Sequence, residues 1–168
     1  VKGPLGEQAS LFTLTERKTR EEIILKVEKT TQEAIQEALD GLENKYSAAG
    51  FKVKFKTVTF DNGVEFLDWK YLEISVLKLG ERRTMIYFAH AYSSWERGTN
   101  ENQNRMIRRF IPKGTDIADV SNEEIERIEH WMNNYPRKIL GYKTAEQMRQ
   151  EYFQNNSKND LKLKSVAL

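Results

Sequence analysis

The alternation of short β-branched runs with helically spaced apolar residues constrains the fold of this chain more than any other feature. Ser10–Thr15 and Glu22–Val27 are such runs, and the polar stretch Arg17–Arg20 between them has the length of a hairpin connection. Apolar residues then recur at helical spacing from Ala34 to Tyr46. The pattern therefore predicts a β-hairpin followed by an amphipathic helix.

The later segments continue this mixture of strands and helices. The predicted elements are a helix that begins after the capping box of Thr30 with Glu33 and ends at Gly50, a strand over Phe51–Phe60, a helix over Glu65–Leu79, a strand over Arg83–Phe88, a helix over Asn100–Ile111, and helices after the capping boxes of Ser121 with Glu124 and Thr144 with Gln147. We expect one α/β domain over residues 1–153, with a central mixed sheet flanked by helices, and a polar tail over residues 154–168.

The composition excludes several kinds of site. The chain has no cysteine and two histidines, which rules out disulfide scaffolds, cysteine nucleophiles and three-histidine metal centres. Its apolar runs are far shorter than the roughly 20 residues that span a bilayer. The chain begins at Val1 without a signal-peptide pattern or an initiator Met, so we expect a cytoplasmic protein and a fragment of a longer one.

Asp61 is the first candidate functional residue. It stands where the predicted strand Phe51–Phe60 ends, and Asn62 and Gly63 follow it. Ligands of open α/β sheets bind in the crevice beyond the carboxyl ends of the strands, so a carboxylate at this point would face a binding site. Asp-Asn-Gly is also typical of a tight turn. The spacing alone leaves both interpretations open and favours the turn.

Glu101 is the second candidate, in the first turn of a predicted helix. Arg105 and Arg108 share its helical face, and the stretch from Arg105 to Lys113 holds four basic residues and no acid. A glutamate at a helix N-terminus is ordinarily a favourable interaction with the helix dipole. An acid beside arginines also suits phosphate chemistry, because carboxylates bind hard divalent cations and guanidinium groups bind phosphates.

Taken as a pair, Asp61 and Glu101 suggest phosphoryl transfer with two metal ions. In such sites two Mg²⁺ ions, roughly 3.5–4 Å apart, activate the attacking group and stabilise the leaving oxygen. The predicted strand and helix between the two acids can return Glu101 to the crevice beside Asp61. Two carboxylates are few for two dications, so a third acid is expected.

Several other residues keep two interpretations each. His90 follows a predicted strand and either orients a phosphate or a water molecule or is structural. Tyr92 and Trp95 either stack on an unpaired base or belong to the core or its rim. Arg137 and Lys138 provide either a second phosphate contact or a solvated loop.

Five motifs occur in order along the chain. They are Leu14–Arg20 (LTERKTR), Phe60–Phe66 (FDNGVEF), Tyr92–Asn104 (YSSWERGTNENQN), Phe110–Asp116 (FIPKGTD) and Asn133–Tyr142 (NNYPRKILGY). Over roughly residues 1–153 the chain closely resembles the catalytic core of bacterial insertion-sequence transposases of the IS-thirty family, within the retroviral integrase-like D-D-E superfamily.

This resemblance implies an RNase H-like fold and Mg²⁺-dependent cleavage and joining of DNA at element ends, with Mn²⁺ as a substitute. Asp61 then corresponds to the second catalytic aspartate of the family and Glu101 to its glutamate, both as metal ligands. The residues implied to contact DNA are Trp95, Arg97, Asn100, Arg105, Arg108, Arg109 and Lys113, and the candidate neighbours of the active site are Asn62, Gly63, His90 and Asn104. The family also implies a nucleoid-associated protein that forms a dimer or larger assembly when two DNA ends are paired.

The chain departs from the family's pattern in three ways. The first catalytic aspartate is absent, and we expect it on a strand ahead of Val1, so that this chain alone is weak or inactive. The interval between Asp61 and Glu101 is a few residues longer than usual, and His90-Ala91 replaces a common Asp-Pro. The helix-turn-helix region that recognises terminal repeats is expected elsewhere. Rival interpretations are a nuclease-inactive DNA-binding or assembly module derived from a transposase, and a nuclease of another kind such as a resolvase.

Overall fold

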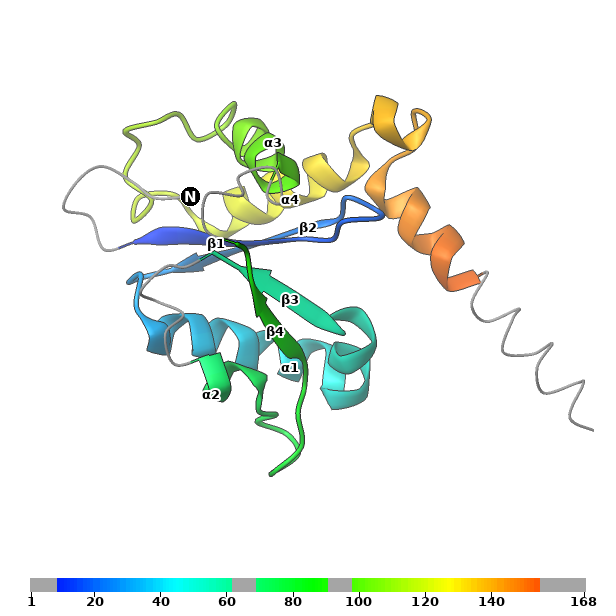
Figure 1. Cartoon of the computed structure of the whole chain (residues 1–168). Coiled ribbons are helices and arrows are strands. Elements are labelled where there is room, and N and C mark those ends of the chain that lie inside the picture. Colours follow the sequence, from blue (N-terminus) through cyan, green and yellow to red (C-terminus); the bar gives the residue numbers. More distant parts are fainter. Residues whose placement is uncertain (1–8, 62–68, 91–97, 155–168) are drawn as a thin grey trace, which may run out of the picture.

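A β-hairpin forms the middle layer of the fold. The computed structural model describes residues 9–61, 69–90 and 98–154. In it, β1 (Ser10–Thr15) pairs antiparallel with β2 (Glu22–Val27), so the predicted hairpin is confirmed. Helices α3 (Gly98–Ile107) and α4 (Asn122–Asn134) cover one face of this hairpin, and α1 (Gln32–Lys54) lies on the other (Figure 1).

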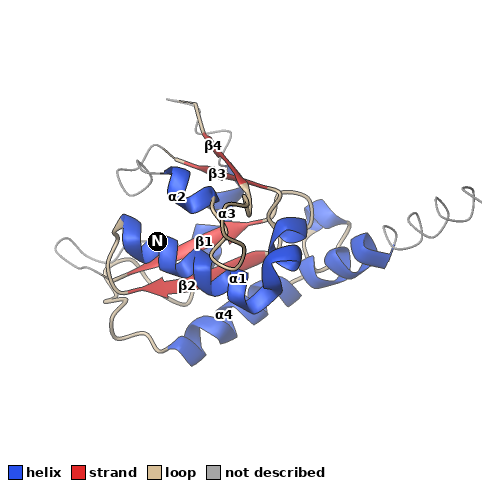
Figure 2. Ribbon diagram, turned by 90° about the horizontal axis from the view of Figure 1, so that it is seen from below, coloured by secondary structure: helices blue, strands red, loops and turns tan. Residues whose placement is uncertain are grey.

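A second pair of strands lies on the α1 side of the hairpin. β3 (Thr57–Phe60) pairs in parallel with β4 (Met85–Phe88), next to the short helix α2 (Trp69–Glu73) (Figure 2). The 3₁₀ helix η3 (Lys138–Leu140) and a helix over residues 145–154 follow α4. The fold is mixed α/β as predicted, but the strands of the described residues form two separate two-stranded sheets instead of one central sheet.

Alternation along the hairpin divides the core in two. Successive strand side chains point to opposite faces. Leu11 and Ile24 therefore pack with α3 and α4, whereas Phe12 and Ile23 pack with α1 and β3. On α4 the residues Ile125, Ile128 and Met132 recur at helical spacing and pack into the part of the core that holds Leu11 and Ile24. Both faces of the hairpin are thus buried, which fixes its register.

The start of helix α1 differs by one residue from the prediction. Thr31, rather than Thr30, is the N-cap, and its side chain accepts the Ala34 N–H at 3.4 Å. The Thr30 hydroxyl donates instead to the hydroxyl of Ser10 at the start of β1. The long-range contact with Ser10 therefore decides which of two adjacent threonines caps the helix.

The C-terminal end of helix α1 differs from the prediction by four residues. The helix breaks at Ser47, where φ is 63°, but continues past Gly50 to Lys54, so Gly50 does not close it. Phe51 and Phe55, which alternate with lysines and suggested a strand, are also one helical turn apart. The Phe55 N–H donates to the Phe51 carbonyl at 2.7 Å, and the ring centroids lie 4.6 Å apart. The predicted strand over 51–60 is thereby shortened to β3.

The predicted helix over 65–79 is also wrong in its second half. After α2 the chain forms a tight hairpin, with Ile74 paired to Arg82 and the Ser75 N–H donating to the Glu81 carbonyl at 2.9 Å. A buried ionic cluster explains this turn. The fully buried guanidinium of Arg83 contacts Asp40 and Glu43 on α1. The Glu43 carboxylate also accepts a hydrogen bond from the hydroxyl of Ser75.

Of the two predicted C-terminal capping boxes, the one at Ser121 shows the hydrogen bond of its serine, and the one at Thr144 shows both of its hydrogen bonds. The Ser121 hydroxyl accepts the Glu124 N–H at 3.2 Å, and Thr144 and Gln147 exchange hydrogen bonds at 2.9 and 3.1 Å. Within the described ranges no helix is long and apolar enough to cross a membrane.

Candidate nucleic-acid interface and acidic site

Helix α3 holds the predicted Glu101 and Arg105 on one face, and Arg108 directly follows its last residue. Glu101 and Arg105 are exposed and Arg108 is half-buried, whereas Met106 and Ile107 pack into the core. The helix is therefore amphipathic in the orientation that the sequence predicted. It ends at Ile107, four residues earlier than predicted, and the Ile111 N–H still bonds to the Ile107 carbonyl.

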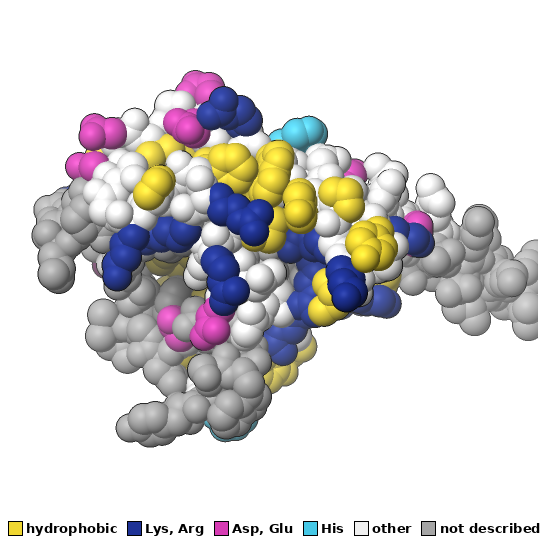
Figure 3. Space-filling view, turned by 90° about the horizontal axis from the view of Figure 1, so that it is seen from above, with side chains coloured by type: hydrophobic (Ala, Val, Ile, Leu, Met, Phe, Trp, Pro, Cys, Tyr) yellow, Lys and Arg dark blue, Asp and Glu magenta, His cyan; other side chains and the backbone are white. Residues whose placement is uncertain are grey.

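Basic side chains continue beyond the end of α3. Arg109 and Lys113 are exposed, and the Arg108 guanidinium donates to the Pro112 carbonyl at 3.2 Å. Figure 3 shows Lys and Arg side chains around a strip of hydrophobic ones on the face that carries α3 and α4. Phe110 is 38% exposed and packs edge-on against Trp131 with ring centroids 4.8 Å apart.

Asp61 lies directly after β3 and lines a cavity of about 540 Å³ between β1 and β3. The start of α3 reaches the same cavity through Thr99 and Asn100, and Asn104 follows one turn later. The structure thus brings Asp61 and the helical turn that carries Glu101 to one cavity. Glu101 itself does not line it.

Asp61 offers this cavity a carboxylate, the kind of ligand that Mg²⁺ prefers in proteins. Five basic side chains also line the cavity, namely Arg17, Lys18, Lys54, Lys56 and Arg149. The described residues contain no group of three or more acidic or histidine side chains able to hold a metal. A two-metal centre would therefore need a further acid from outside these ranges.

Of the four candidate neighbours of the active site, His90 and Asn104 belong to the described residues. Asn62, Gly63, Trp95 and Arg97 lie outside the described residues. His90 follows β4 and is exposed. Asn104 lines the cavity, and its Oδ1 is buried without a hydrogen-bond partner in the described structure. Of the candidate neighbours, Asn104 therefore lies at the cavity of Asp61, as predicted, although the sequence could not show that its oxygen is buried.

Side chains cap the outer edges of both strand pairs. On β2 the Glu22 N–H donates to Asn133 Oδ1 at 2.8 Å, and the Ile24 N–H donates to the Glu129 carboxylate at 2.7 Å. On β4 the Ile86 N–H donates to the carboxylate of Glu73 on α2, again at 2.8 Å. Edges that are capped in this way do not add a further strand.

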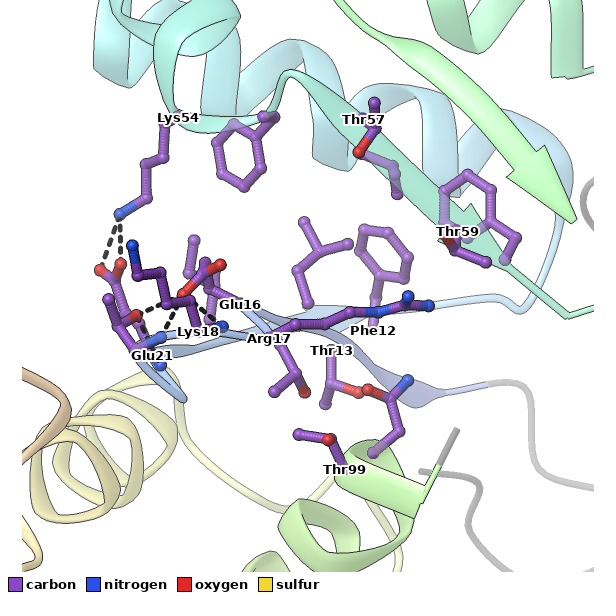
Figure 4. Close-up of a pocket in the computed structure, with 18 of the residues that line it drawn as sticks. Phe12, Thr13, Glu16, Arg17, Lys18, Glu21, Lys54, Thr57, Thr59 and Thr99 are labelled. Carbon is purple, nitrogen blue, oxygen red and sulfur yellow. Dashed lines mark hydrogen bonds and ion pairs between the residues drawn. The ribbon is translucent and has the colours of Figure 1, made fainter. Parts of the chain in front are cut away.

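The inner edges face the cavity instead. Because Glu22 and Ile24 direct their N–H groups outward, their partners Thr15 and Thr13 on β1 direct theirs away from β2. Just before and along β3, the carbonyls of Lys56 and Phe60 accept hydrogen bonds from the β4 segment. The backbone N–H and C=O groups of Thr57 and Thr59 therefore point away from β4. Figure 4 shows Thr57 and Thr59 on one side of the cavity and Thr13 on the other. The cavity therefore lies between two strand edges.

A buried polar cluster lies between the hairpin, α3 and α4. The Glu22 side chain is fully buried; Thr15 Oγ1 donates to its Oε2 at 2.6 Å, and its Oε1 has no partner in the described structure. Burial raises the pKa of Glu22 to about 7, against the opposing effects of the Thr15 hydrogen bond and the Arg137 charge.

Arg137 belongs to the same cluster, so neither predicted role for it holds. Its side chain is buried, and its Nη1 donates to Gln103 Oε1 at 2.6 Å and its Nη2 to the Met132 carbonyl at 2.9 Å. It therefore makes neither a phosphate contact nor a solvated loop. Lys138 is exposed to solvent at the start of the 3₁₀ helix η3.

Comparison with known proteins relates the chain to transposases. It is 45% identical over 60% of its length to the transposase of insertion sequence element IS4351 from Bacteroides fragilis, of which it covers 29%. It is 35% identical over 86% of its length to a probable transposase of element IS1161 from Streptococcus salivarius, covering 37% of that protein. It is 32% identical over 84% of its length to the InsI transposase of element IS30C from Escherichia coli K12, covering 34%. No family model matches the chain.

These relatives are all transposases of insertion sequences, and the chain is similar to them over most of its length. Within that class the chain belongs to the IS30 family, the IS-thirty family of the sequence analysis. The chain spans about a third of the length of the curated relatives that it matches.

Proposed function

We propose that this chain is the catalytic core of a DNA transposase, which cleaves and joins DNA strands at the ends of a transposable element. The observation that carries the proposal is the meeting of Asp61 and the first turn of α3 at one cavity. The transposase relatives support the same assignment.

Asp61 and Glu101 would hold Mg²⁺, together with a third acid from outside the described residues. When bound, the metal neutralises charge at the reacting phosphate. The two carboxylates fix its place, because one follows a strand and the other belongs to a helix anchored in the core. Water, and then a DNA 3′-hydroxyl, would attack phosphodiesters in line, so catalysis rests on positioning and charge stabilisation.

The cavity between β1 and β3 supports an RNase H-like sheet as part of this proposal. A strand inserted there would join the hairpin to the parallel pair and make one mixed sheet, while the capped outer edges exclude extension elsewhere. An acid on the inserted strand could lie beside Asp61. The resemblance gives the missing first aspartate to a strand ahead of Val1, and we propose that this strand is the one inserted here.

The basic side chains of α3 and of the segment after it would bind DNA phosphates. Arg105 on α3, and Arg109 and Lys113 after it, are exposed. Phosphate contacts of this kind position DNA without reading its sequence. They would hold the DNA near the cavity that the start of α3 lines.

Because the first catalytic aspartate is expected on a strand ahead of Val1, cleavage of element-end DNA in Mn²⁺ or Mg²⁺ by the chain extended to include that strand tests the proposal. Asp61→Asn and Glu101→Gln should each lower cleavage by at least about a hundredfold, as expected for loss of a metal ligand. The exposed Asp119→Asn and Glu126→Gln serve as matched controls and should retain activity. Equal activity in all four variants would contradict the catalytic assignment.

A second candidate is a DNA-binding or assembly module without nuclease activity. It is favoured by the lack of a three-acid group within the described ranges. In that case the chain extended to include the missing strand should bind DNA with a steep salt dependence but show no cleavage in either metal, whether or not Asp61 and Glu101 are intact.

A further inference from the structure

We propose that a second copy of this chain docks on the surface formed by the 74–82 hairpin and the outer face of β4. Seven large apolar side chains gather between residues 71 and 87, each at least 40% exposed. They are Tyr71, Ile74, Val76, Leu77, Leu79, Met85 and Tyr87, and are named the apolar patch below. Figure 1 shows this hairpin projecting beyond β4, on the opposite side of the molecule from α3 and α4. The patch therefore lies apart from the basic side chains that would bind DNA.

Alternation in the 74–82 hairpin directs two of these side chains away from α1. Ser75 is buried, and its hydroxyl donates to the carboxylate of Glu43 on α1. Successive side chains of an extended segment point to opposite sides. Ile74 and Val76, on either side of Ser75, therefore point outward, and they are 40% and 53% exposed.

The outer face of β4 continues this surface. Ile86 packs into the same core cluster as α1, whereas Met85 and Tyr87 on either side of it are exposed. Their partners in the register of β3 are Thr57 and Thr59, which are exposed as well. The parallel pair of strands thus has one exposed face, which points away from α1 in the same way as the outer side of the 74–82 hairpin.

The tip of the 74–82 hairpin presents a leucine on an ordered turn. Leu79 is completely exposed. The Glu81 N–H donates to the Lys78 carbonyl at 3.1 Å, and the Lys78 N–H donates to the Ser75 hydroxyl at 2.9 Å. Gly80 has a φ of 79°, a conformation that suits glycine. Because the core does not use Leu79, its place beside other exposed apolar side chains indicates an interaction surface.

The charges of this hairpin favour a protein partner over DNA. Lys78 Nζ lies 3.6 Å from Glu81 Oε1. Arg82 Nε lies 3.5 Å from Glu73 Oε2, and Arg83 is paired with acids of α1. Each basic side chain of the segment thus has an acidic partner, whereas binding of DNA phosphates relies on cationic groups that replace counterions. An apolar surface with balanced charges suits another such surface.

Size and symmetry favour a second copy of this chain as that partner. A standard interface buries about 800 Å² of each protein. Seven large apolar side chains, exposed by 40% to 101%, supply an area of that order. Tyrosine and methionine, which are enriched at interfaces, are both present. In a twofold dimer the same patch serves both chains, and Glu81 beside Arg82 gives its edge both signs of charge, so the patch does not repel its own copy.

Sedimentation of the 168-residue chain without DNA or metal tests the inference. Interfaces of this size bind in the micromolar range or tighter, so the parent should be dimeric at about 100 μM. Leu79→Glu should weaken dimerisation at least tenfold, because each dimer then places two carboxylates in an apolar contact. Ile139→Glu, on η3 at a side chain that is 71% exposed, is the matched control and should sediment like the parent. Circular dichroism establishes that each variant is folded.

Thiol reactivity supplies the second measurement, since the chain has no cysteine. The thiol introduced by Met85→Cys should react more slowly with a maleimide as the protein concentration rises, because the dimer covers β4. The thiol introduced by Ile139→Cys should react at a constant rate. A monomeric parent at the same concentration, a dimer that Leu79→Glu leaves intact, or a constant rate in Met85→Cys would each overturn the inference. None of these results bears on the metal-dependent cleavage of the proposed function.

Discussion

Replacing the buried carboxylate of Glu22 by an amide should remove a pH dependence from the stability of the fold. Glu22 lies at the start of β2, is fully buried, and has a pKa raised by burial from 4.5 to about 7. The folded state therefore retains its proton at pH values where the unfolded state has released it. Stability is highest, with respect to this group, below pH 4.5 and is lost as the pH rises to about 7.

The size of the effect follows from the shift. At about 1.4 kcal/mol per unit, a rise from 4.5 to about 7 corresponds to about 3 kcal/mol. Glu22→Gln keeps an acceptor for the Thr15 hydroxyl but cannot ionise. The free energy of unfolding of the variant, minus that of the parent, should therefore grow by about 3 kcal/mol between pH 4.5 and pH 7.5.

Urea unfolding followed by tryptophan fluorescence at several pH values measures this difference. Glu129, whose pKa burial also raises, is present in both proteins and largely cancels from the comparison. The exposed Glu28→Gln is the matched control and should follow the parent at every pH. If Glu22→Gln and the parent lose stability in parallel over this range, the carboxylate is not buried as the structure has it, and the reasoning fails.

Three further outcomes follow from other parts of the structure. Arg83→Met should destabilise the fold by about 3–5 kcal/mol in chemical unfolding, because it leaves the carboxylate of Glu43 buried without its partner; a loss below about 1 kcal/mol would mean that water reaches this cluster. Ser121→Ala should cost about 1 kcal/mol by the same measurement, through loss of the α4 cap, and a neutral result would show that the cap is redundant. Replacing Arg105 and Arg109 together by alanine should weaken binding to DNA of any sequence and lower the slope of log K against log salt by about 2; an unchanged slope would exclude both from the DNA contact.

The local elements of the fold were largely predictable from the sequence. The β-branched runs Ser10–Thr15 and Glu22–Val27, with a short polar stretch between them, sufficed for the hairpin. The capping residue Ser121 and the helical pattern that follows it sufficed for α4. The amphipathic face of α3 was predictable in the same way, since a period of 3.6 separates buried from exposed positions. These features depend on interactions within one element, which a short stretch of sequence contains.

The errors occurred where a local pattern fits two structures. Phe51 and Phe55 alternate with lysines as in a strand and are also one helical turn apart, and only their contact in the core selects the helix. The turn after Glu73 depends on the buried Arg83, which bonds to a different helix. No pattern within residues 65–79 contains that information.

The sequence by itself determined the hairpin of β1 and β2 and the helices α3 and α4, and it placed Asp61 at a strand end and Glu101 in a first helical turn. Only the tertiary structure decided that both segments meet at one cavity and that its walls are two strand edges. It also decided that Arg137, charged and close to a proline in the sequence, is buried against Gln103 from another helix. The physical reason is that periodicity shows which face of an element is buried, whereas the partner of that face depends on contacts between residues far apart in the chain.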